Sequence, residues 1–223
     1  MRKNSGTPDL IAELAGNLSQ PSETKNLESA YWLRWGGAFV SFAIATLFMC
    51  WMWPDRARLP QNVFETHFIL SALLWFGTFL VAARLAYLSI LPLSHRSAIT
   101  AALGGITVVL AVVIFSPASP ASFAAELADE LQLYRGPCGL YIGVTGLIAG
   151  TLLLRVMRRG AADNKSASGV WTLAAAGALS SFFMHLICRH ETPGHAFIWH
   201  ILPVSALILL GAFIATRLLQ DRA

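Results

Sequence analysis

The chain has 223 residues, of which 56% are hydrophobic and 13% are charged, and its mean hydropathy is +0.59. This composition is too apolar for a soluble domain, whose surface must face water, and it is typical of an integral membrane protein. The formal net charge of +4 does not indicate nucleic-acid binding, because the arginines lie beside apolar runs, as the positive-inside rule predicts.

Residues 7–18 are predicted to form a short amphipathic helix. Thr7 can cap its start, Pro8 suits the first helical position, and Asp9 lies in the first turn. The apolar face consists of Leu10, Ile11, Leu14 and Leu18. A helix of about three turns is marginally stable in water, so we expect this face to bind the bilayer, the rest of the chain or another protein. Residues 19–26 are predicted to be a flexible tether.

Six apolar runs are predicted to be transmembrane helices, because each can cross about 30 Å of hydrocarbon as a helix. They lie at about 35–53, 68–88, 98–115, 139–157, 170–188 and 196–214. The predicted fold is an all-α six-helix transmembrane bundle (31–219) that follows an N-terminal segment (1–30). Most basic residues outside these runs fall on one side if the N-terminus is inside, so both termini are predicted to be cytoplasmic.

The region between the third and fourth runs is predicted to contain another amphipathic helix. Its apolar stripe consists of Phe123, Leu127, Leu131 and Tyr134, and its opposite side carries Glu126, Asp129 and Glu130. We expect this helix to lie on the outer membrane surface. An irregular loop is the alternative.

The predicted topology gathers the reactive side chains on the outer side of the bundle. All three cysteines lie there, at the ends of predicted spans: Cys50, Cys138 and Cys188. Every histidine except His95 falls on the same side: His67, His185, His190, His195 and His200. A single thiol or imidazole in such a place is usually a packing or interfacial residue, but this joint segregation indicates a functional site.

The fourth and fifth runs form a predicted hairpin, which brings Cys138 and Cys188 to similar depth on neighbouring antiparallel helices. The sequence leaves open whether they face each other. Thiolates and imidazoles together suit a soft or borderline metal such as copper or zinc. The candidate metal ligands among the histidines are His185, His190, His195 and His200.

Disulfide formation is the alternative to metal binding for this cysteine pair, because disulfides persist outside the cytoplasm. Cys138 follows Gly136 and Pro137 at a predicted helix start, where the helix dipole stabilises a thiolate, whereas Cys188 ends a helix. Cys138 would then be the nucleophile and Cys188 the resolving partner. The sequence does not separate metal binding from disulfide formation.

Several short motifs resemble those of NrsF-type anti-sigma factors, over nearly the whole chain. They are Asp9-Leu10-Ile11-Ala12-Glu13-Leu14, Arg135-Gly136-Pro137-Cys138, His185-Leu186-Ile187-Cys188 and Trp199-His200. The resemblance implies a bacterial inner-membrane protein whose cytoplasmic N-terminal region, including Asp9, binds an extracytoplasmic-function sigma factor. It also implies that a cysteine pair, here Cys138 and Cys188, responds to metal or oxidative stress. Cys50 has no counterpart in that pair and is expected to be structural.

Two other functions, a haem protein and a metal transporter, are alternatives to a regulator. The sequence has no H-E-x-x-H, P-loop or G-x-S-x-G motif, so it does not indicate an enzyme. A membrane haem protein would use His185 with His67 or His200 as axial ligands. A metal transporter would use the outer histidines as an entry site.

Overall fold

The computed structural model describes residues 21–52, 66–89, 119–132, 137–157, 165–188 and 192–218. All the secondary structure in these residues is helical, which confirms the predicted all-α class for this part of the chain. The chain divides into two compact units, Met1–Gly37 and Ala38–Ala223. The helices of the bundle pack together within the second unit.

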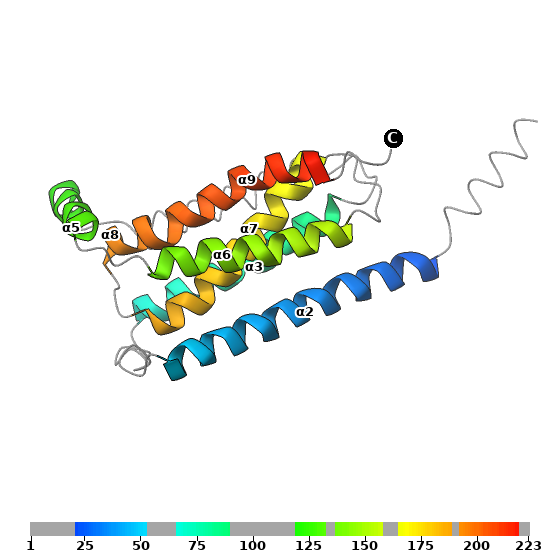
Figure 1. Cartoon of the computed structure of the whole chain (residues 1–223), viewed down its shortest axis with the longest axis horizontal. Helices are drawn as coiled ribbons and strands as arrows, with labels where there is room; N and C mark the ends of the chain where they lie inside the picture. The colour runs from blue at the N-terminus through cyan, green and yellow to red at the C-terminus, as the bar shows by residue number, and fades with distance from the viewer. Residues whose placement is uncertain are drawn as a thin grey trace, which may run out of the picture. The chain divides into compact units, whose positions relative to one another are not determined.

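The helices appear in a simple order along the chain (Figure 1). They are α2 (Pro21–Met52), α3 (Thr66–Leu88), α5 (Pro120–Gln132), α6 (Pro137–Met157), α7 (Lys165–Ile187), α8 (Pro193–Ala196), the π-helical turn η1 (Phe197–Ile201) and α9 (Leu202–Leu218). Four of these helices begin with a proline, which has no amide hydrogen to lose and whose fixed φ suits the first helical position.

Four described helices are long and apolar enough to cross a membrane. They are Phe68–Leu88, Cys138–Arg155, Lys165–Ile187 and Pro193–Leu218, and they correspond to the second, fourth, fifth and sixth predicted spans. The first predicted span, 35–53, overlaps α2 as far as Met52, and α2 is not among these four. The third, 98–115, lies outside the described residues.

The structure differs from the sequence prediction at the start of α2. Residues 21–26 were predicted to be part of a flexible tether, but they are helical. Pro21 is the first residue of α2, a position that suits the fixed φ of proline. The helix therefore begins more than three turns before the apolar run.

Helix α7 lies at the centre of the bundle and packs against α3, α6 and α9 (Figure 1). Small residues allow this close packing. A side-chain carbon added at Gly169 would clash with the backbone of Gly211 on α9, and one added at Gly150 on α6 would clash with Leu173. The bundle faces outward with exposed apolar side chains, including Ile148 on α6 and Leu209 on α9, as a lipid-facing surface requires.

The second half of α2 contacts both α6 and α7. The Phe183 ring of α7 lies 5.0 Å from the Phe39 ring and 6.1 Å from the Phe42 ring, measured between centroids. On α6, the Tyr141 hydroxyl is hydrogen-bonded to the Thr46 hydroxyl at 3.1 Å. The two helices that carry Cys138 and Cys188 therefore both touch α2.

Candidate metal centre

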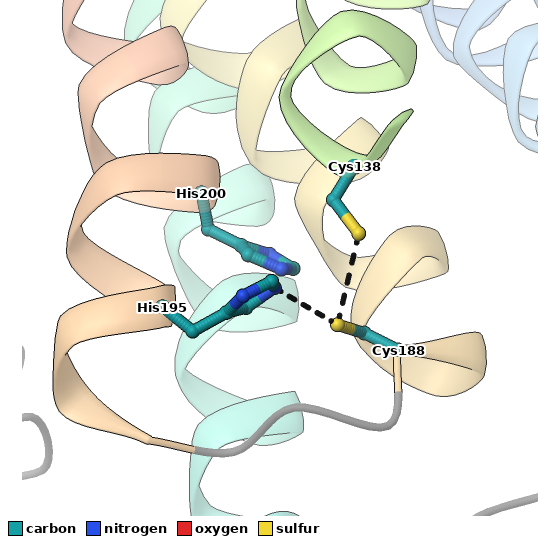
Figure 2. Close-up of side chains that lie close together, drawn as sticks. All are labelled: Cys138, Cys188, His195 and His200. Carbon is teal, nitrogen blue, oxygen red and sulfur yellow. Dashed lines mark hydrogen bonds between the residues drawn. The ribbon is translucent and has the colours of Figure 1, made fainter. Parts of the chain in front are cut away.

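Two cysteines and two histidines converge at one end of the bundle (Figure 2). They are Cys138, Cys188, His195 and His200, and all four are buried. One potential ligand atom from each residue lies within 4.8 Å of the corresponding atoms of the other three. Such a set of two thiols and two imidazoles is typical of tetrahedral zinc sites.

The antiparallel packing of α6 and α7 brings the two cysteines together. Cys138 is the second residue of α6, and Cys188 directly follows the last residue of α7. Their Sγ atoms lie 3.8 Å apart, and neither cysteine is in a disulfide with a described residue. A disulfide would need about 2.05 Å, whereas two thiolates bound tetrahedrally at about 2.3 Å from one zinc ion lie about 3.8 Å apart. The prediction that these residues share the same depth is confirmed.

The π-helical turn explains how both histidines reach the site. In a regular α-helix, residues five positions apart such as His195 and His200 would point about 140° apart. In η1 the hydrogen bonds run between residues five apart, which brings the two imidazoles to one side, with ring centroids 5.7 Å apart. Thr192 fixes the start of α8, because its hydroxyl accepts a hydrogen bond from the His195 amide at 3.3 Å.

His195 lies between a thiol and a carboxylate. Its Nε2 atom is 3.2 Å from the Cys188 Sγ atom, and its Nδ1 atom is 3.0 Å from Glu130 Oε2. The indole of Trp199 donates to the same Glu130 oxygen at 3.1 Å. A carboxylate behind the histidine is the usual outer partner of a metal-binding imidazole.

His200 provides an independent sign that a ligand belongs here. Its side chain is only 3% exposed, and its Nδ1 atom is buried without a hydrogen-bond partner among the described residues. Buried polar atoms are normally satisfied, because leaving one unpaired costs about 1–3 kcal/mol. A metal ion bound by this imidazole and the adjacent thiols fits that arrangement.

The local environment keeps the Cys188 thiol protonated in the absence of metal. Cys188 lies just beyond the end of α7, and its hydrogen bond with Cys138 together with burial raises the pKa of its thiol. Metal binding would therefore displace protons from the thiols, since the thiolate is the form that binds metal.

Two glutamates on the polar side of the predicted 123–134 helix belong to the site. α5 is a helix, as predicted, and its Leu131 is 73% exposed, but Glu130 is only 3% exposed. Glu126 accepts a hydrogen bond from the Gly194 amide at 3.0 Å. The two carboxylates face α8 because it offers buried donors, and the sequence analysis missed both as members of the site. Their four-residue spacing on one helix face was the available signal.

The structure brings together two of the four candidate histidine ligands. His185 lies elsewhere: its ring stacks on Phe68 with centroids 4.6 Å apart, and its Nε2 atom is 3.2 Å from the Phe68 carbonyl oxygen. His190 lies outside the described residues, as do Asp9, Leu10, Ile11, Leu14 and Leu18. The side chains of Cys50 and His67 are likewise not described.

Comparison with known protein families finds one that matches this chain. The family model NrsF, described as "Negative regulator of sigma F", matches residues 14–220, which is nearly the whole chain. No curated protein and no solved structure matches the chain.

Proposed function

Because the chain belongs to the NrsF family of negative regulators of sigma F, we propose that it is a membrane-embedded anti-sigma factor controlled by a metal ion. In this proposal its N-terminal segment holds an extracytoplasmic-function sigma factor inactive at the bacterial inner membrane. Binding of zinc or copper to Cys138, Cys188, His195 and His200 then releases the sigma factor. The proposal that a metal ion controls the chain rests on the buried cluster of two thiols and two imidazoles.

Membrane insertion is supported by the four apolar helices of membrane-spanning length and by the exposed apolar side chains around them. The distribution of basic residues favours cytoplasmic termini. This orientation puts the cysteine end of the bundle on the outer side, where it meets extracellular metal, and the N-terminus on the side where a sigma factor acts.

The proposed sigma-binding surface is the apolar face of residues 7–18. It comprises Leu10, Ile11, Leu14 and Leu18, next to Asp9. A short amphipathic helix gains stability by laying such a face into a groove of a partner. We therefore assign this segment to the sigma factor and the rest of the chain to the sensor.

The contacts of α2 support a route from the sensor to the N-terminal segment. Tyr141 lies one turn after Cys138 and is hydrogen-bonded to Thr46 of α2, while Phe183 lies five residues before Cys188 and contacts Phe39 of α2. A metal ion bound by both thiols would fix the packing of α6 against α7, and with it their contacts with α2. Release requires that the metal bind more tightly to the sigma-free state.

The contacts of His185 argue against the haem alternative. His185 was the common axial ligand of that hypothesis, and its ring and its Nε2 atom contact Phe68 instead. A Soret absorption band in the purified chain would reverse this conclusion. A transporter function predicts metal flux into vesicles that does not depend on residues 1–20.

Copurification tests the proposal directly. The full-length chain, extracted from bacterial membranes in mild detergent, should carry an extracytoplasmic-function sigma factor detectable by mass spectrometry. Zinc or copper(I) should elute that sigma factor, and magnesium, which prefers oxygen ligands, should not. Absence of any sigma factor would contradict the anti-sigma role. If the sigma factor stayed bound at saturating zinc and copper(I) and was eluted by an oxidant alone, a disulfide switch rather than metal binding would control its release.

A further inference from the structure

Glu130 joins α5 to the candidate metal centre. Its Oε2 atom accepts hydrogen bonds from His195 Nδ1 at 3.0 Å and from the Trp199 indole at 3.1 Å. The carboxylate is 3% exposed and the His195 side chain is fully buried. A carboxylate is costly to bury without partners, and here two donors from α8 and η1 supply them.

This contact sets which nitrogen of His195 faces the thiols. In a neutral imidazole one nitrogen donates and the other accepts, and a carboxylate can only accept. Hydrogen bonding to Glu130 therefore places the proton on Nδ1 and leaves the lone pair on Nε2, the atom that lies 3.2 Å from Cys188. That is the form of histidine that binds a metal through Nε2.

A second carboxylate ties the same helix to the residue before His195. Glu126 lies one turn before Glu130 and accepts from the Gly194 amide at 3.0 Å. Gly194 permits this approach, since a side-chain carbon added there would lie 2.8 Å from Glu126 Cβ and 3.2 Å from its carbonyl carbon. α5 thus contacts this segment through two carboxylates: Glu126 at the backbone amide of Gly194, and Glu130 at the side chain of His195.

We propose that Glu130 is the positioning residue of the metal centre and that it makes the docking of α5 on α8 depend on metal occupancy. This inference rests on the proposed metal site and not on sigma-factor capture. Coupling between two events is reciprocal: if Glu130 strengthens metal binding through His195, then bound metal strengthens the docking of α5. α5 is then the part of the outer face that changes when metal arrives.

Metal affinity tests the positioning role. The full-length chain in detergent is titrated with cobalt(II), whose thiolate and ligand-field absorption bands report the ligand set, and with zinc in competition. Glu130→Gln keeps the size of the side chain but weakens the acceptor, and we expect about a 10–100-fold loss of affinity. Asp129→Asn removes the same charge from the neighbouring exposed position and should bind like the wild-type chain. Trp199→Phe removes the second donor to Glu130 and should keep most of the affinity.

Hydrogen exchange tests the coupling to α5. Saturating zinc should slow amide exchange across residues 120–132 in the wild-type chain and in Asp129→Asn, and this response should be absent in Glu130→Gln at equal occupancy. Wild-type affinity together with an unchanged exchange response in Glu130→Gln would overturn this inference alone. A wild-type chain that binds neither cobalt nor zinc would overturn both the metal centre and the role of Glu130. Circular dichroism and a single gel-filtration peak establish that each variant is folded.

Discussion

The thiols of Cys138 and Cys188 lie 3.8 Å apart although 50 residues separate them in the chain. One begins α6 and the other follows the end of α7, so their separation reports how these two antiparallel helices pack at one end. Any ligand that binds both sulfur atoms must fix that packing. The same two helices contact α2, whose chain leads back to the N-terminal segment.

The histidines of this chain are expected to divide into ligands and non-ligands. His195→Gln and His200→Gln should each weaken zinc binding by at least tenfold, because each removes one of four ligands. His185→Gln should leave zinc affinity unchanged, since His185 contacts Phe68 rather than the cluster. Competition with a chromophoric zinc chelator measures all three. Equal losses for the three variants would show that the ligand set is assigned wrongly.

Adding a methyl group at Gly194 should displace α5. Gly194→Ala would place its new carbon 2.8 Å from Glu126 Cβ, close to α5 backbone atoms that cannot move separately. Overpacking of this kind typically costs about 1–3 kcal/mol, and we expect weaker zinc binding and faster exchange of α5 amides. Gly143→Ala is the matched control, because nothing lies within 4 Å of the added carbon. Similar behaviour of the two variants would count against the docking of α5 described above.

The hydrogen bond between Tyr141 and Thr46 is expected to carry part of the signal from the cysteines to α2. Tyr141→Phe removes this bond and keeps the ring. A bond of this kind contributes about 1 kcal/mol, so zinc affinity should stay within threefold of wild type. The zinc concentration that releases half of the bound sigma factor should rise severalfold. Thr46→Val removes the same bond from the other side and should behave alike; a normal release midpoint in both variants would exclude this route.

Removing residues 1–20 should abolish sigma-factor capture without affecting the sensor. The truncated chain keeps all four cluster residues, so we expect membrane insertion and wild-type zinc affinity together with loss of the copurifying sigma factor. Substitution of Leu10 and Leu14 by serine in the full chain should have the same effect through the apolar face alone. If a sigma factor still copurified with the truncated chain, the sigma-binding surface would lie outside residues 1–20.

Composition and hydropathy predicted the helical class and the positions of four described membrane-length helices well, because apolar runs of about 20 residues are unambiguous. Helix starts were less accurate. Pro21 begins α2 and Lys165 begins α7, both before the apolar runs, so hydropathy alone does not mark where these helices begin. The hairpin argument predicted that Cys138 and Cys188 share one depth, and the short distance between their sulfur atoms confirms it.

The ligand set was harder to predict, because it depends on details of backbone geometry and tertiary contact. His185 was one of the candidate ligands, yet the packing of α3 against α7 places its ring on Phe68. The π-helical turn brings His200 beside His195, and an α-helical template would separate them. Glu130 was assigned to a polar outer face because its partners, His195 and Trp199, lie more than 60 residues further along the chain.

Release of the sigma factor as a function of metal occupancy tests the central claim most directly. The full-length chain is loaded with its sigma factor in detergent, and zinc or copper(I) is titrated while bound metal and retained sigma factor are measured together. We predict that release follows occupancy, and that Cys138→Ser and Cys188→Ser retain the sigma factor at all metal concentrations, whereas Cys50→Ser releases it normally. Complete retention by the wild-type chain at full metal occupancy, or normal release from both Cys138→Ser and Cys188→Ser, would contradict it.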